Sequence, residues 1–357
     1  MDFTDTPEQA ALRESVRGFL RKYATADRIR QAAEDPLGRD RPTWDRLTGE
    51  LGLTALAVPE SHDGMGATFA EVAIAVEELG RVLLPSPYLS TALVGVVLGE
   101  LAGESPEAAA RFLPGLAAGT LIGAFALAGP LTARHDGGGH RVSGLARHVV
   151  DGPQADVIVA RAGDALFAVR AEDVTVTPVG TLDQTRRQAI VEFADAPALP
   201  LGADAGPAAA DRAEDLVRTA LAVECAGAAD RCIATTVDFL RTRVQFGRPI
   251  GTFQALKHRC ADLAVEVASA RAVARAAVAA AVEDPAEFAI AAPLANLHCA
   301  AVFQRVAGEM IQLHGGVGFT WEHEAHLYFK RAKSTRLLSG STSQLRTLVG
   351  RRAGLLG

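Results

Sequence analysis

The spacing of apolar positions divides the chain into three segments. Up to about residue 117, apolar side chains recur every three or four residues, which predicts amphipathic helices. Between about 118 and 205 the apolar runs become short, and Gly, Asp or Pro separates them at a spacing of about 8–12 residues, typical of a small antiparallel sheet or barrel. From Ala213 the helical period returns in longer runs.

The first segment predicts helices over residues 6–24, 43–52, 69–83, 92–103 and 106–119. The last segment predicts a bundle of about four helices, over 214–243, 253–283, 285–314 and 324–338, plus a terminal helix over 341–354. A Gly/Pro/Ala linker at 203–211 precedes the bundle. We therefore expect an α+β fold that is mainly α, with an N-terminal helical domain (1–117), a small antiparallel β domain (118–205) and a C-terminal helical bundle (206–357).

Composition and charge narrow the classes of function. Hydrophobic residues make up 49% of the chain and aromatic residues only 5%, so small aliphatic side chains must fill the core, which favours close helix packing. The net charge of −6 argues against nucleic acid as the main partner, because phosphate binding needs a basic surface. Long apolar stretches are interrupted by charges, and residues 1–20 lack the features of a signal peptide. We therefore expect a cytoplasmic protein without membrane insertion.

The four cysteines, Cys225, Cys232, Cys260 and Cys299, form no CxxC pair. In a cytoplasmic protein we expect them to be reduced thiols that pack within helices. Further ligands are missing near Cys225 and Cys232, so the sequence predicts no metal site.

Three helix ends carry residues suited to binding an anion. FGRPIGTFQ (246–254) brings Arg243 and Arg248 close to a tight Gly/Pro turn, and guanidinium groups chelate phosphate oxygens. The alternative is a solvated basic helix end that complements the helix dipole. QLHGGVGF (312–319) ends a helix in glycines that let a ligand approach the backbone, or that serve only as a C-cap. STS (341–343) would cap the last helix or bind an anion through its first N–H groups.

Together, the order and spacing of these motifs resemble the acyl-CoA dehydrogenases over nearly the whole chain. Residues 51–81, LGLTALAVPESHDGMGATFAEVAIAVEELGR, resemble the family's Pro-Glu, Gly-rich loop and EELGR block. RVQFGRPIGTFQALKHRCADL (243–263) resembles its R-x-x-F-G-x-x-I-x-x-F-Q signature, and QLHGGVGF its Q-x-x-G-G-x-G-[FY] block. TSQ (342–344) matches part of its E-G-T-S-Q motif. The resemblance is strong in both helical segments and weak in the β segment.

The resemblance implies FAD bound at a subunit interface and α,β-dehydrogenation of an acyl-CoA thioester, with electrons passed to a separate acceptor. In this family a carboxylate removes the α-proton while the flavin accepts a hydride. Six residues match positions that contact the adenosine-diphosphate half of a neighbouring subunit's FAD. Arg243, Phe246 and Gln254 match one side of that pocket, and Gln312, Gly315 and Gly316 match the other side. Thr342 and Gln344 match residues that contact FAD within the subunit.

The chain departs from the family at the catalytic base. Ser339 or Gly340 stands where E-G-T-S-Q has its glutamate, and neither can act as a base. The family's other base position, on the first long C-terminal helix, holds Val217. Glu224 lies two turns further along the same helix face, and a carboxylate buried among apolar residues would have a raised pKa that suits a base. The alternative is a structural glutamate paired with an arginine.

The chain also departs from the family in the β segment, where LAGPLTARHDGGG and ARHVVDG replace the segments that usually touch the flavin ring. Glu322 and Glu324 follow the glycine loop and suit an interface or helix cap better than catalysis.

The whole pattern resembles the shorter subunit of actinobacterial α2β2 dehydrogenases of steroid side-chain β-oxidation, in which a larger partner supplies the flavin-ring pocket and the base. We expect such a heterotetramer, acting in lipid or steroid side-chain breakdown. The alternatives are a homodimer or homotetramer with a non-standard base such as Glu224, and a non-catalytic structural subunit of the same fold.

Overall fold

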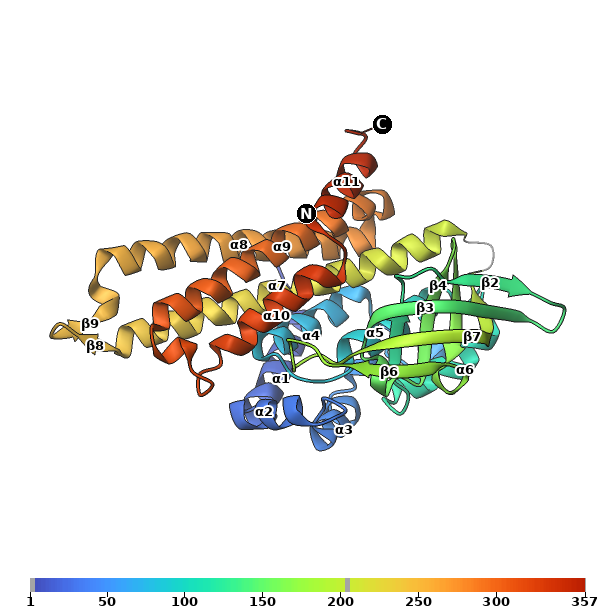
Figure 1. Cartoon of the computed structure of the whole chain (residues 1–357), viewed down its shortest axis with the longest axis horizontal. Coiled ribbons are helices and arrows are strands. Elements are labelled where there is room, and N and C mark those ends of the chain that lie inside the picture. The colour runs from blue at the N-terminus through green and yellow to red at the C-terminus, as the bar shows by residue number, and fades with distance from the viewer. Residues whose placement is uncertain (1–3, 203–205, 357) are drawn as a thin grey trace. The chain divides into compact units, whose positions relative to one another are not determined.

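The computed structural model describes residues 4–202 and 206–356. The contacts among these residues define two compact units: residues 4–26, 76–84 and 218–356 form unit 1, and residues 27–75, 85–202 and 206–217 form unit 2. The chain is mainly helical with a small sheet, which confirms the fold class expected from the sequence (Figure 1). The three domain ranges stay a prediction, and the start of the predicted linker, residues 203–205, lies outside the described residues.

Unit 1 contains the expected bundle of four helices and a terminal helix. These are α7 (Pro207–Thr242, from Arg218 onward in this unit), α8 (Gln254–Glu283), α9 (Pro285–His314), α10 (Ala325–Leu338) and α11 (Thr342–Arg352). α9 packs against α8, α10 and α11. Alanines at 270, 274 and 277 are buried along α8, and such small side chains let neighbouring helices approach closely. α7 begins at Pro207, earlier than expected, because proline suits the first helical turn and alanines follow it.

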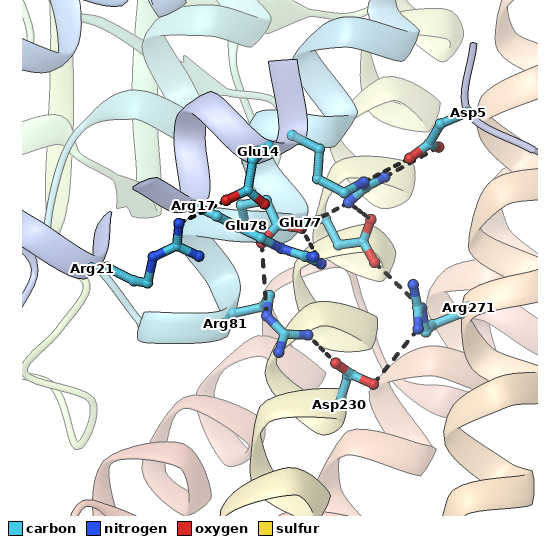
Figure 2. A network of polar contacts seen from close by, with 10 residues as sticks. Asp5, Glu14, Arg17, Arg21, Glu77, Glu78, Arg81, Asp230 and Arg271 are labelled. Atoms are coloured by element: carbon cyan, nitrogen blue, oxygen red, sulfur yellow. Dashed lines mark hydrogen bonds and ion pairs between the residues drawn. The ribbon is translucent and has the colours of Figure 1, made fainter. Parts of the chain in front are cut away.

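Unit 1 also contains α1 (Pro7–Tyr23) and the end of α4 (Phe69–Val82), which a network of ion pairs joins to the bundle (Figure 2). At its centre the Arg13 guanidinium donates to carboxylates of Asp5 at 2.7 Å, Glu77 at 2.6 Å and Glu78 at 2.8 Å. Arg17, Arg81, Asp230 and Arg271 extend the network to α7 and α8. Arg13 is only 8% exposed, so these charges are largely removed from water.

Unit 2 is built around a seven-stranded sheet. Its strands are β1 (Gly123–Ala126), β2 (Thr132–His135), β3 (His140–Val150), β4 (Val157–Ala162), β5 (Ala165–Arg170), β6 (Thr175–Val179) and β7 (Gln188–Leu201). The order is β1-β4-β5-β7-β3-β2, and β6 also pairs with β7. Among these strands the pairs are antiparallel except β1–β4, which is parallel because the chain passes through β2 and β3 between them.

The helices of unit 2 are α2 (Ala26–Glu34), α3 (Arg41–Gly49), the first part of α4, α5 (Tyr88–Glu100) and α6 (Pro106–Ala117). α5 packs against β1 and α6 and is buried over most of its length. The sheet contributes its own core, in which Val142, Ile158 and Val191 are fully buried. α2 and β2 were not predicted from the sequence.

Within the described residues one helix, α9, is long and apolar enough to cross a membrane. Half of its most apolar window is buried inside the protein, and it packs against three other helices. The core helix of a bundle has the same length and composition, so this helix is weak evidence for membrane insertion.

Candidate functional site

The connection between α7 and α8 is a short hairpin whose turn holds an aromatic residue in a strained conformation. β8 (Val244–Gln245) pairs with β9 (Arg248–Pro249), which leaves Phe246 and Gly247 as a two-residue turn. Their φ angles are +55° and +75°, the signs of a type I′ turn, which favours Asn-Gly. A left-handed conformation costs a residue with a side chain about 1–2 kcal/mol. Phe246 is 88% exposed, so burial within this chain does not offset that cost.

Cationic and aromatic groups gather on this hairpin. The Arg248 guanidinium lies 4.2 Å from the centre of the Phe253 ring, and the Phe246 ring meets Phe253 edge-on with 6.0 Å between centres. Arg243, directly after α7, and Gln254, the first residue of α8, are both exposed. The structure therefore brings the predicted residues Arg243, Phe246 and Gln254 onto one short connection.

The glycine loop, residues 315–324, connects α9 to α10. Gly315 has φ +59°, and its N–H donates to the Gln312 carbonyl at 3.2 Å. Gly318 is required by packing, because a Cβ there would lie 2.7 Å from the Ile311 carbonyl oxygen. Gly316 differs: its φ is −56°, and no described atom outside its chain neighbours lies within 4 Å of the place a Cβ would take. Nothing in the described residues of this chain requires a glycine at 316.

The hairpin and the glycine loop lie at the same end of the bundle (Figure 1). Phe239, one turn before Arg243, stacks on His314 at the end of α9, with 4.4 Å between ring centres. Two further aromatic side chains extend from the loop, Phe319 at 86% and Trp321 at 73% exposure. Both predicted sides of the pocket, Arg243 with its hairpin and Gln312 with its glycines, thus meet at one exposed surface, which we call the open end.

Thr342 and Gln344 lie elsewhere in unit 1, in the first turn of α11. Ser341 caps this helix, which is one of the two uses that the sequence predicted for residues 341–343. The Ser341 N–H also donates to Gln344 Oε1 at 2.8 Å, which completes a capping box. Thr342 lines a pocket of about 300 Å³ together with residues of α9 between Leu294 and Ala301, and with two arginines, Arg336 and Arg346. At about 1.5 Å per residue, Ala301 precedes Gln312 by roughly 16 Å along α9. The chain therefore carries two separate groups of predicted cofactor contacts.

Glu224 of α7 is buried beside a cation. It is 7% exposed, and Arg331 of α10, 3% exposed, donates to its Oε1 at 2.7 Å. Gly80 of α4 makes room for it, because a Cβ at Gly80 would lie 2.8 Å from Glu224 Cγ. This is the arginine-paired glutamate that the sequence left as the alternative to a base. The catalytic role of Glu224 stays a prediction.

The family's two base positions are filled by groups without a carboxylate. Ser339 is the C-cap of α10, Gly340 follows it with φ +103°, and Val217 lies on α7. Glu322 is exposed in the glycine loop, and Glu324 forms an ion pair with Arg231 of α7 at 3.5 Å. Among the described residues no group of three or more His, Cys, Asp or Glu is placed to hold a metal ion, and the four cysteines are free thiols.

Sequence reasoning missed the residues that hold these sites in place. Arg331 lies 107 positions from Glu224, and only its place among buried residues of α10, such as Tyr328 and Thr335, marks it as inward-facing. Phe239 precedes Arg243 by four residues, so its position on the same helix face could have been recognised.

Two family models match this chain, one over its N-terminal part and one over its C-terminal part. The model of the acyl-CoA dehydrogenase N-terminal domain matches residues 6–120, and that of the C-terminal domain matches residues 204–354. Acyl-CoA dehydrogenase IpdE2 of Mycobacterium tuberculosis is 41% identical over 97% of this chain and 97% of its own length. IpdE2 of Mycolicibacterium smegmatis is 37% identical over 96% and 97%.

Solved structures of the same fold cover the whole chain. The ChsE4–ChsE5 complex from Mycobacterium tuberculosis contains a chain that is 28% identical, with a TM-score of 0.90 over 100% of both chains. The Tcur3481–Tcur3483 steroid ACAD variant is also 28% identical, with a TM-score of 0.90 over 98% of this chain and 99% of its own. With sequence, fold and motif placement in agreement, this chain belongs to the acyl-CoA dehydrogenase family.

Proposed function

We propose that this chain is the shorter subunit of an FAD-dependent acyl-CoA dehydrogenase that carries out α,β-dehydrogenation of an acyl-CoA thioester. The observation that carries the proposal is the open end of the bundle, where two motifs far apart in sequence meet with their side chains exposed. The residues that would hold the adenosine-diphosphate half of a neighbouring subunit's FAD are Arg243, Phe246, Gln254, Gln312, Gly315 and Gly316.

The open end suits a dinucleotide in charge, shape and stacking. Arg243 and Arg248 supply guanidinium groups for a pyrophosphate. The exposed Phe246 ring offers an apolar face to a base, and the free space at Gly316 lets a ligand approach the backbone. FAD, when bound, supplies the oxidant for the dehydrogenation. The part of this chain is to bind and orient the adenosine-diphosphate half, while Thr342 and Gln344 contact FAD within the subunit.

The missing base supports a heteromeric enzyme. Neither family base position carries a carboxylate, and Glu224 is already paired with Arg331. In our proposal a larger partner subunit supplies the base and the flavin-ring pocket, giving an α2β2 tetramer that passes electrons to a separate acceptor. The similarity to a chain of the ChsE4–ChsE5 complex supports a heteromeric form, and the similarity to a steroid ACAD supports a steroid or related lipid substrate. Our proposal places the reaction in the cytoplasm and at the side chain of that substrate.

A homo-oligomer that uses Glu224 as base is the second candidate, favoured by the burial of this carboxylate on the helix that carries the family's second base position. Glu224→Gln separates the two, because glutamine keeps a hydrogen bond to Arg331 and cannot take a proton. In the heteromeric enzyme the variant retains turnover and loses only thermal stability. In the homo-oligomer turnover disappears while FAD stays bound.

The binding role is tested with Arg243→Ala, measuring FAD per chain in the assembled enzyme by visible absorption. Loss of a charge-assisted hydrogen bond, worth about 1.5–3 kcal/mol, should weaken FAD binding by about tenfold to hundredfold. Arg241→Ala is the matched control, because Arg241 is equally exposed on the last turn of α7 and points to a different side of the helix. Unchanged flavin content in Arg243→Ala would count against the proposal.

A further inference from the structure

The glycine loop is attached to α7 at both of its ends. At the start of the loop, His314 stacks on Phe239. At its end, Glu324 forms an ion pair with Arg231 at 3.5 Å and accepts a hydrogen bond from the Thr235 hydroxyl at 3.4 Å. The three α7 residues are spaced by four, so they form one stripe along a single face of the helix.

Arg243 continues this stripe, four residues after Phe239, and its N–H donates to the Phe239 carbonyl at 2.9 Å. The distance between the Arg243 side chain and the loop glycines is therefore set by how the loop is held on the stripe. A displacement of the loop would separate the two sides of the open end without unfolding either helix.

The His314 ring is the most enclosed part of this attachment. It lies between Phe239, at 4.4 Å, and His323, at 4.3 Å between ring centres, and is 4% exposed. Its Nδ1 lies 2.7 Å from the Met310 carbonyl oxygen, which can only accept, so Nδ1 carries the proton. Its Nε2 is buried and has no hydrogen-bond partner among the described residues. A second proton would therefore place an unpaired N–H and a charge between two rings.

We infer that His314 is a positioning residue, which holds the glycine loop in register with Arg243 only while its imidazole is neutral. The movement of the loop is inferred from geometry alone. Its consequence for FAD binding rests on the proposed function. Acid would convert the stacked neutral ring into a buried cation and release the start of the loop from α7.

The charges around His314 determine the direction of the pH effect. Burial lowers the pKa of His314 below its ordinary value of 6.5, while the Met310 carbonyl and Glu324 act in the opposite direction without reversing the shift. The other titratable groups of this region are Arg231 and Cys232 on α7, His323 in the loop and Tyr328 on α10. Because the folded pKa lies below the unfolded one, the contribution of neutral His314 is present above pH 6.5 and is lost as the pH falls through the folded value.

The test is amide hydrogen exchange of residues 315–320 at about pH 7.5 and about pH 5.5, on either side of the ordinary histidine pKa, with rates corrected for intrinsic exchange. In the unaltered chain the corrected rates should rise on acidification, by at most about tenfold per pH unit, the limit for one titrating group. His314→Phe keeps an aromatic ring in the stack and cannot titrate, so its loop should show no pH response. His258→Phe, which removes an exposed imidazole from α8, should respond like the unaltered chain.

A loop in His314→Phe that keeps the normal pH response overturns the inference and assigns the response to His323 or another group. If His314→Phe does not fold, His314→Gln serves instead, because glutamine can donate to Met310 O and does not titrate. FAD retention by the assembled enzyme is measured across the same pH range. A loop that opens with acid while FAD retention stays constant supports the positioning role of His314 and counts against the proposed FAD contact of this loop.

Discussion

Two regions of unit 1 differ in whether their charged and aromatic side chains are enclosed within the chain or exposed at its surface. Around Arg13 the charges of α1, α4, α7 and α8 are buried or partly buried and are paired with one another (Figure 2). At the open end, Arg243 and the rings of Phe246, Phe319 and Trp321 are exposed. The first region is complete within one chain, and in our proposal a neighbouring subunit and its FAD complete the second. Substitutions in the first should therefore change folding stability, and substitutions in the second should change assembly and FAD binding.

The largest effect is expected from Arg13→Ala. It leaves the carboxylates of Glu77 and Glu78 buried with fewer partners, and such broken pairs cost about 3–5 kcal/mol of the free energy of unfolding. The measurement is urea-induced unfolding. Arg21→Ala is the control: its pair with Glu14 is exposed, so it should cost less than about 1 kcal/mol. If the two substitutions lower the free energy of unfolding equally, the network around Arg13 stabilises the fold no more than an exposed ion pair does.

A second comparison uses two glycines in the same loop. Gly318→Ala should lower the free energy of unfolding by about 1–3 kcal/mol, because its Cβ would overlap the Ile311 carbonyl. Gly316→Ala should leave unfolding almost unchanged and weaken FAD binding, because its Cβ fills space that no described atom of this chain uses. Thermal unfolding and FAD titration are measured for both. Full FAD affinity in Gly316→Ala contradicts a ligand at this position.

Phe246→Gly separates the effect of the strained Phe246 backbone on folding stability from the effect of its exposed ring on assembly. Glycine relieves the strain of a φ of +55° but adds chain entropy, so the folded chain should become more stable by up to about 1 kcal/mol. Loss of the exposed ring should weaken assembly about tenfold, as for an aromatic interface residue. Sedimentation at several concentrations checks the second effect. A variant that is less stable and assembles normally would mean that the ring serves folding.

The smallest effect concerns Asp5. Burial acts to raise the pKa of Asp5, but its hydrogen bonds to Arg13 and the charges of Arg13 and Arg275 outweigh burial and hold the pKa below its ordinary value of 3.8. The stability from this carboxylate is therefore present above pH 3.8 and is lost as pH falls through the folded value. Asp5→Asn should cost up to about 1 kcal/mol at neutral pH, and the difference should vanish in acid. Denaturant melts at a series of pH values check it.

The elements predicted best from the sequence are those with long periods or strong end signals. The long helices α8 and α9 show a helical spacing of apolar residues along 30 residues each. Thr6-Pro7 marks the start of α1, where Thr6 forms a capping box. The short elements α2 and β2, and the parallel pairing of β1 with β4, depend on tertiary contacts that no local pattern reveals.

For the candidate site, the motifs pointed to the α7–α8 and α9–α10 connections, and the structure adds what surrounds these two connections. The sequence placed Arg243 and Gly315 on separate helix ends, and their meeting depends on the parallel course of α7 and α9, whose C-terminal ends lie together and bring Phe239 onto His314. The burial of Glu224 could be expected from its apolar neighbours, but its partner Arg331 could not, because the pair joins helices 107 residues apart in sequence.

Sedimentation velocity, recorded at both the protein and the flavin absorption bands, tests the central claim most directly. The chain purified alone should sediment with little or no flavin, and flavin absorbance should appear only in an oligomer formed after co-expression with a larger, base-carrying relative. Flavin that sediments with the monomeric chain at about one FAD per chain would contradict the account, because the open end would then be complete without a neighbour.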